Sequence, residues 1–97
     1  MFARVHVLQA TPEQSEAGMQ IFLEQLRPWL RDASGYRGLI RLEDKESGKT
    51  LVITFWADEE ALEASQVAGE QLAELTAENT GAERLATELY EATVFDL

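Results

Sequence analysis

Residues 35–58 read Gly35-Tyr36-Arg37-Gly38-Leu39-Ile40-Arg41-Leu42-Glu43-Asp44-Lys45-Glu46-Ser47-Gly48-Lys49-Thr50-Leu51-Val52-Ile53-Thr54-Phe55-Trp56-Ala57-Asp58. Two apolar runs flank a Ser-Gly pair, a pattern typical of a β-hairpin with a tight turn. Asp58 follows at once, and its short carboxylate is suited to accept the free amide hydrogens of a helix's first turn. The segment therefore predicts strand, turn, strand and helix start.

The register of this hairpin follows from its turn. With Ser47-Gly48 as a two-residue loop, Ile40 pairs with Phe55 on one face of the sheet and Leu39 pairs with Trp56 on the other. A slip of one residue would set apolar side chains beside mixed ones, so the assignment of residues to faces is strongly constrained.

The two faces of the hairpin differ in composition. One is almost wholly apolar, and we expect the helices to cover it: Ile40, Leu42, Ile53 and Phe55. The other is mixed but still carries large apolar side chains: Leu39, Val52 and Trp56. An exposed apolar patch on a sheet usually marks an interface. We therefore expect this second face to pack against the sheet of a second copy in a homodimer.

Upstream of the hairpin, alternation predicts a strand over residues 2–9. Thr11-Pro12-Glu13-Gln14 combines an N-cap threonine, proline at the first helical position and a capping-box glutamine, which predicts a helix from there to about Arg31. Pro28 should kink the last turn or end the regular helix just before Trp29.

Downstream of the hairpin, a helical pattern extends from Ala57 to about Asn79, with a break expected near Gly69. The cluster Asn79-Thr80-Gly81 should stop it. A two-residue period then predicts a fourth strand from about Thr87 to Leu97. The order βαββαβ is the ferredoxin-like, split βαβ arrangement: an α+β fold with a four-stranded antiparallel sheet, formed by residues 1–97 as a single domain.

Composition restricts the function. The 97 residues carry a net charge of −10, which disfavours nucleic-acid binding because phosphate recognition needs a cationic surface. There is no cysteine, so disulfides and thiolate chemistry are excluded. No segment has the length and hydrophobicity of a membrane span, and we expect a cytoplasmic protein that binds no membrane.

Few residues are candidates for chemistry. His6, the single histidine, could act as a general base near neutral pH, although a structural role on its strand is the alternative. Trp56 is the second catalytic candidate. Further aromatic side chains could line a flat pocket for a small-molecule ligand, or simply fill the core: Phe22, Trp29, Tyr36, Phe55 and Tyr90. Arg41, with Arg37, could bind a carboxylate or enolate, or else pair with Glu43 or with acids of a partner subunit.

The strand order, the Gly35-Tyr36-Arg37-Gly38 segment, the Ile53-Thr54-Phe55-Trp56 strand and the Asp58-Glu59-Glu60-Ala61-Leu62 helix start resemble the antibiotic biosynthesis monooxygenase family. The resemblance covers the whole chain in layout and implies the dimeric α+β barrel fold. It also implies a homodimer and, in some members, cofactor-independent oxygenation of anthrones or quinols to quinones.

Carried over by position, the family's strand-three tryptophan corresponds to Trp56. Quinol-oxygenase-like members have a histidine nine residues later, where this chain has Ser65. Haem-degrading members need an Asn on strand one and a Trp and a His in later helices. This chain has no Asn before Asn79 and no Trp or His after Trp56, so we expect no haem and no other cofactor. Two hypotheses remain: a cofactor-independent monooxygenase acting on a small aromatic, polyketide-like or quinol compound, and a non-catalytic ligand-binding or dimerisation module.

Overall fold

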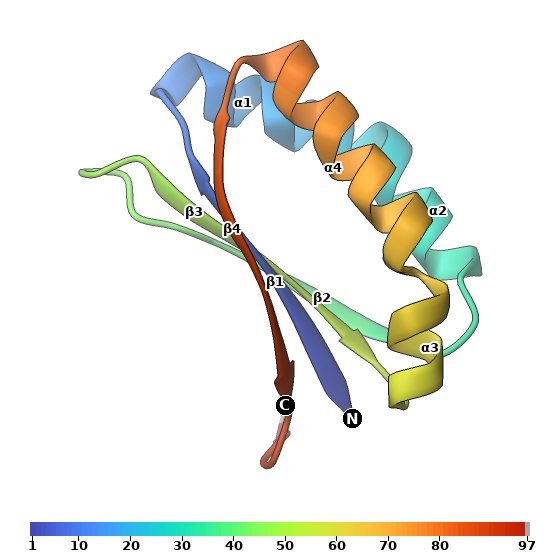
Figure 1. The fold of residues 1–97 in the computed structure, drawn as a ribbon. Helices are drawn as coiled ribbons and strands as arrows, with labels where there is room; N and C mark the ends of the chain where they lie inside the picture. Colours follow the sequence, from blue (N-terminus) through green and yellow to red (C-terminus); the bar gives the residue numbers. More distant parts are fainter. Residues whose placement is uncertain (97) are drawn as a thin grey trace.

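Four antiparallel strands form one sheet in the order β2-β3-β1-β4, and all the helices lie against one face of it (Figure 1). The structure is a computed structural model that describes residues 1–96. Its elements are β1 (Phe2–Gln9), α1 (Pro12–Ile21), the π-helical turn η1 (Phe22–Leu26), α2 (Arg27–Asp32), β2 (Tyr36–Glu43), β3 (Lys49–Trp56), α3 (Glu59–Ala64), α4 (Gln66–Thr80) and β4 (Glu83–Glu91). The ferredoxin-like α+β fold predicted from the sequence is confirmed, and β1 has the predicted bounds.

The β2–β3 hairpin forms as predicted, but its register differs by two residues. Ile40 pairs with Ile53, and Leu39 pairs with Thr54. The turn is longer than two residues because Asp44 closes it: its carboxylate accepts from the amides of Glu46 and Ser47, at 3.0 and 3.4 Å. A shift of an even number of residues leaves each side chain on its predicted face.

The expectation for which face the helices cover is wrong. Trp56 is fully buried and forms the core with Leu30 and Leu62, so the face carrying Leu39, Val52 and Trp56 lies under the helices. The almost wholly apolar face is the open one, and Leu42 on it is 48% exposed. The number of apolar residues on each face does not predict which face the helices cover. The covered side contains a partly polar cavity, which needs fewer apolar groups than a solid core.

The first helix starts as predicted, with both hydrogen bonds of the Thr11–Gln14 capping box present. It does not end before Trp29 but continues to Asp32. The irregularity lies one turn earlier, in η1. Pro28 lacks an amide hydrogen and its ring crowds the carbonyl four residues before it, and a wider π turn just upstream relieves that conflict.

The second helical region breaks at Ser65, not near Gly69 as expected. At the break, the Leu62 carbonyl accepts from Ser65 Oγ at 2.8 Å and from the Arg4 guanidinium at 2.8 Å, which ends α3. The predicted stop is confirmed, since Gly81 caps α4 in the left-handed conformation with φ 76°.

The last strand begins earlier than predicted. β4 spans Glu83–Glu91, so residues 92–96 lie beyond it, and Leu97 lies outside the described residues. The early start follows from β1, whose Leu8 and Gln9 pair with Arg84 and Glu83. None of the helices described for residues 1–96 has the length and hydrophobicity needed to cross a membrane.

Candidate functional site

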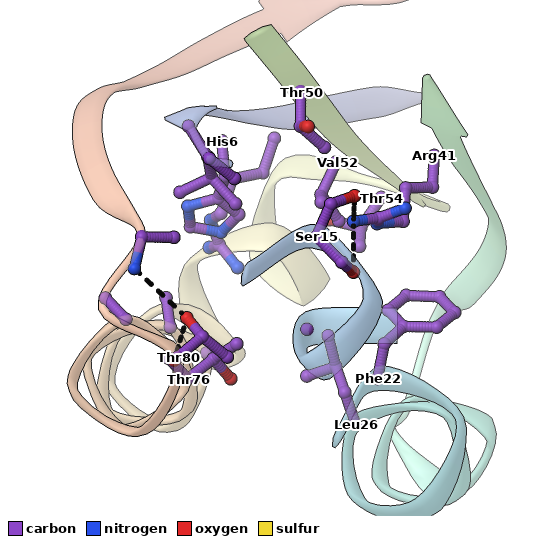
Figure 2. Close-up of a pocket in the computed structure, with 18 of the residues that line it drawn as sticks. His6, Ser15, Phe22, Leu26, Arg41, Thr50, Val52, Thr54, Thr76 and Thr80 are labelled. Atoms are coloured by element: carbon purple, nitrogen blue, oxygen red, sulfur yellow. Dashed lines mark hydrogen bonds between the residues drawn. The ribbon is translucent and has the colours of Figure 1, made fainter. Parts of the chain in front are cut away.

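A cavity of about 80 Å³ lies between the sheet and the helices. Figure 2 shows Thr50, Val52 and Thr54 of β3 on one side of it, Phe22 on another and Thr76 of α4 on the third. The side chains that bound it thus come from the sheet, from the first helix and from α4.

The cavity exists because α4 presents small residues to the sheet. Gly69, Ala73 and Ala77 line it, and they are too short to fill the space that separates a helix from a sheet. Thr76 and Thr80 also line it, but each hydroxyl donates at 2.8 Å to the carbonyl four residues earlier, at Leu72 and Thr76. Their hydroxyl hydrogens are therefore already used within the helix.

Trp56 lines the cavity and is fully buried. Its indole Nε1 donates to Thr54 Oγ1 at 3.0 Å, and the Tyr36 ring meets it edge-on with centroids 6.0 Å apart. This packing leaves the indole a single orientation. Phe22 and Leu26, brought into the wall by the turn η1, continue the apolar lining (Figure 2).

The ionisable side chains that line the cavity are all basic. Although the chain carries 18 acidic and 8 basic residues, the lining side chains include Arg4, Arg41 and His6 and no carboxylate. An apolar wall with a few cationic or neutral polar groups favours ligands that are aromatic, anionic or both.

Arg41 is already neutralised. Its Nη1 binds Glu43 Oε1, and its Nη2 lies 3.3 Å from Ser15 Oγ, which itself donates to the same carboxylate oxygen. The hydrogen bonds from Ser15 and Arg41 lower the pKa of the Glu43 carboxyl, so this ion pair persists at neutral pH. It ties β2 to α1 along one edge of the cavity.

His6 is neutral at physiological pH. Burial, together with the positive charges of Arg4 and Arg84, lowers its pKa from 6.5 to about 4, and Glu70 opposes this only in part. Its Nδ1 lies 3.3 Å from Thr87 Oγ1, whose other partner is Arg84 Nη2 at 3.4 Å. A neutral imidazole beside a cavity can accept a proton from a ligand.

Arg4 is 3% exposed and has only neutral partners within hydrogen-bonding distance. Its Nη1 donates to Ser65 Oγ at 3.1 Å and its Nη2 donates to the Leu62 carbonyl at 2.8 Å. Burial lowers the pKa of Arg4 while the charge of Glu70 raises it, and a guanidinium stays protonated at neutral pH. Glu70 itself is held by Arg84.

The structure brings together most of the site residues predicted from the sequence. Those that line the cavity are His6, Trp56, Phe22, Trp29 and Arg41. The others lie elsewhere: Tyr36 packs behind Trp56, Phe55 stacks edge-on against Phe95 at 4.9 Å, and Tyr90 is 53% exposed on the edge strand β4.

Arg4 and Ser65 are not among the site residues predicted from the sequence. The signal for Arg4 was available, because it alternates with His6 along β1 and so shares its face of the sheet. Ser65 stands out in the sequence only as the position of a histidine in quinol-oxygenase-like relatives, and nothing local indicates its hydrogen bond to a residue 61 positions away. Among residues 1–96, no three His, Asp or Glu side chains come together in a way that could hold a metal ion.

Comparison with known proteins gives a clear family. The profile of the antibiotic biosynthesis monooxygenases matches residues 1–73. The chain belongs to this family. Comparison with curated proteins gives no significant match.

Solved structures of the antibiotic biosynthesis monooxygenase type share the fold. A Deinococcus radiodurans protein assigned to these monooxygenases is 19% identical, with a TM-score of 0.76 over 100% of this chain and 97% of its own. SnoaB, a cofactor-independent oxygenase from Streptomyces nogalater, is 13% identical, with a TM-score of 0.72 over 97% and 94%. A Streptomyces coelicolor monooxygenase from the gene ActVA-Orf6, in complex with Nanaomycin D, is 13% identical, with a TM-score of 0.66 over 99% and 92%.

Proposed function

We propose that this protein is a cofactor-independent monooxygenase that acts on a small aromatic, polyketide-like or quinol compound bound beneath the helices. The observation that carries the proposal is the cavity bounded by Trp56 and Phe22, with the neutral imidazole of His6 at its edge. Family membership supports the reaction class, and SnoaB, a cofactor-independent oxygenase with this fold, supports the absence of a cofactor.

The chemistry follows from what borders the cavity. His6 takes a proton from the ligand, and the electron-rich anion that remains reacts with oxygen where water is excluded. The guanidinium group of Arg4, which lines the cavity and is in neither of the ion pairs formed within residues 1–96, favours that anion. With an anthrone, one oxygen atom of O₂ becomes the new carbonyl oxygen, and the other leaves as water with the two methylene hydrogens.

The cavity must enlarge to admit a ring system. An apolar cavity of about 150 Å³ holds benzene, and the space here is about half of that. Helix α4 is the wall best suited to move, because its inner side chains are small and Val67 and Leu75 on its outer side are 71% and 52% exposed. We therefore expect α4 to move away from the sheet when the ligand enters.

An oxygen electrode tests the reaction. With an anthrone at pH 7, we expect oxygen uptake that saturates with substrate and falls at least about a hundredfold in His6→Ala, the lower end of the usual range for losing a general base. Tyr90→Phe, an exposed position away from the cavity, is the matched control and should keep full activity. Equal uptake by wild type and His6→Ala would contradict the role of His6.

We also propose that two copies pair through the open face of the sheet. The side chains on it include Ile40, Leu42, Leu51, Ile53 and Phe55, and Leu42 on the edge strand β2 pairs with Leu51 on β3. Leaving so much apolar surface in water is unfavourable, and a second sheet would cover it. Sedimentation should give about twice the chain mass of 10.9 kDa.

A matched pair of variants tests this interface. Leu42→Lys should shift the protein toward monomer, because it places a charge in the apolar contact. Leu75→Lys, at a similarly exposed leucine on the outside of α4, should remain dimeric. A wild-type monomer at micromolar concentration, or a dimer unaffected by Leu42→Lys, would contradict the proposal.

A non-catalytic ligand-binding module is the second candidate. Two observations favour it: Ser65 stands where quinol-oxygenase-like relatives have a histidine, and a pKa of about 4 makes His6 a weak base. Saturable binding of an anthrone without oxygen uptake would select this function over the enzyme.

A further inference from the structure

Arg4 is a buried cation without a carboxylate partner. The ion pairs formed within residues 1–96 are Arg41–Glu43 and Arg84–Glu70, and neither includes it. A buried guanidinium held only by a carbonyl and a hydroxyl is less well compensated than one paired with an anion. Burying Arg4 without an anionic partner therefore lowers the stability of the fold. A side chain that only anchored α3 would not need to carry a charge.

Two of the Arg4 hydrogens have partners and others remain available. The bonds to Ser65 and Leu62 each use one hydrogen of a different terminal nitrogen, and each of those nitrogens carries a second hydrogen. A guanidinium presents such hydrogens in one plane, in the geometry that matches a carboxylate.

Gly69 of α4 leaves this guanidinium room. A Cβ atom added there would lie 3.0 Å from Arg4 Nη1, closer than nearly all real contacts of a Cβ. Both residues line the cavity, and no acidic side chain lines it with them. The cationic group therefore borders the space in which a ligand would sit, and no protein carboxylate bordering that space competes for it.

We propose that Arg4 binds an anionic oxygen of the ligand, so that the protein selects aromatic compounds with a carboxylate or an ionised ring hydroxyl over neutral ones. The inference rests on the proposed function in one respect only: it places the ligand in the cavity beneath the helices. The gain comes from pairing a charge that is buried in either state, so the desolvation of Arg4 has already occurred before the ligand arrives.

Calorimetric titration with matched probes tests the inference at pH 7 and low salt. 1-Naphthoate carries a carboxylate, and 1-naphthamide has nearly the same shape without a charge. A charge-assisted hydrogen bond predicts that naphthoate binds about ten- to hundredfold more tightly. 1-Naphthol separates the two sources of anionic oxygen: binding as tight as that of naphthoate, with release of a proton, identifies an ionised ring hydroxyl, and weak binding identifies a carboxylate.

Variants assign the preference to Arg4. Arg4→Met should bring the affinity ratio of naphthoate to naphthamide close to one, whereas Arg37→Met, an exposed arginine that does not line the cavity, should keep it. Because Arg4→Met could also loosen α3, Gly69→Ala provides a second perturbation that keeps the charge and displaces the guanidinium. Gly69→Ala should reduce the affinity ratio of naphthoate to naphthamide. The hydrogen bonds from Arg4 to Ser65 and to the Leu62 carbonyl can adjust to the displacement.

The single histidine gives an independent readout. Naphthoate bound at Arg4 offsets the positive charge that lowers the pKa of His6, so the imidazole pKa measured by NMR should rise on adding naphthoate and not on adding naphthamide. Equal affinities of the two probes for wild type would overturn the inference and leave the proposed function standing. No binding of any of the three probes would also overturn the inference, while oxygen uptake with an anthrone decides the proposed function separately.

Discussion

The pKa of His6 makes the stability of this protein depend on pH in a defined window. In the unfolded chain the imidazole titrates near 6.5, whereas in the folded protein its pKa is about 4. Burial is the largest cause of the lowered pKa, and charged groups from three elements add to it: Arg4 on its own strand, Arg84 on β4 and, with the opposite sign, Glu70 on α4. Between these two pKa values the unfolded state binds a proton that the folded state does not, so stability falls as the pH falls from 6.5 to 4.

The magnitude follows from the two pKa values. At pH 5 most unfolded chains carry the proton and most folded ones do not, which by linkage lowers the free energy of unfolding by about 1–2 kcal/mol relative to pH 7, after allowing for the partial exposure of the ring. Glu43 and Glu70, whose pKa values are lowered from 4.5, act mainly below this window.

Urea unfolding followed by tryptophan fluorescence at pH 7 and pH 5 measures this difference. His6→Gln removes the titration, so its stability should change much less between the two pH values. NMR titration of the single imidazole gives the folded pKa directly. A folded pKa near 6.5, or the same pH dependence in His6→Gln, would refute the reasoning.

Two further substitutions test the packing of the site. Trp56→Phe removes the hydrogen bond to Thr54 and leaves a void at a fully buried position, so it should lower the free energy of unfolding by about 1–3 kcal/mol. Trp29→Phe, at a half-buried position, should lower it less. Equal losses in urea unfolding would contradict the assigned core. Ser65→Ala removes an acceptor from a buried charge and should cost about 1–3 kcal/mol by the same assay, whereas Ser34→Ala, at an exposed serine, should cost almost nothing.

Local signals in the sequence predicted the fold well. The capping box at Thr11, the Asp58 N-cap and the left-handed stop at Gly81 each depend on residues within a few positions of one another. The alternation in the hairpin sorted the side chains into the correct two faces even though the pairing slipped by two residues. Such features are readable because their physical cause is local.

The choice between the two faces could not be made from composition. When helices cover one face of a sheet and the other face is also apolar, both faces favour burial. Side chains such as Ile53 and Phe55 would then suit either face. What decides is the long-range packing of Trp56 against Leu30 and Leu62. The break at Ser65 was missed for the same reason, since its cause is the side chain of Arg4.

The candidate site was predictable in part. The chemistry of His6 and Trp56 marks them as candidates in the sequence, and both border the cavity. Only their aromatic character marks Phe55 and Tyr90, and these two lie on other surfaces. Aromatic character alone does not show which side of a sheet a residue faces, and the cavity itself depends on small residues of α4 that carry no chemical signal.

Filling the cavity tests most directly the claim that the functional site lies beneath the helices. Ala73→Leu places three more carbon atoms into the space from α4, and Ala17→Leu adds the same atoms at an exposed position of α1. Calorimetric titration with an anthrone should give binding to wild type and Ala17→Leu that is lost in Ala73→Leu, while the unfolding free energy of Ala73→Leu stays within about 1–3 kcal/mol of wild type. Undiminished binding by a folded Ala73→Leu would show that the ligand site lies elsewhere.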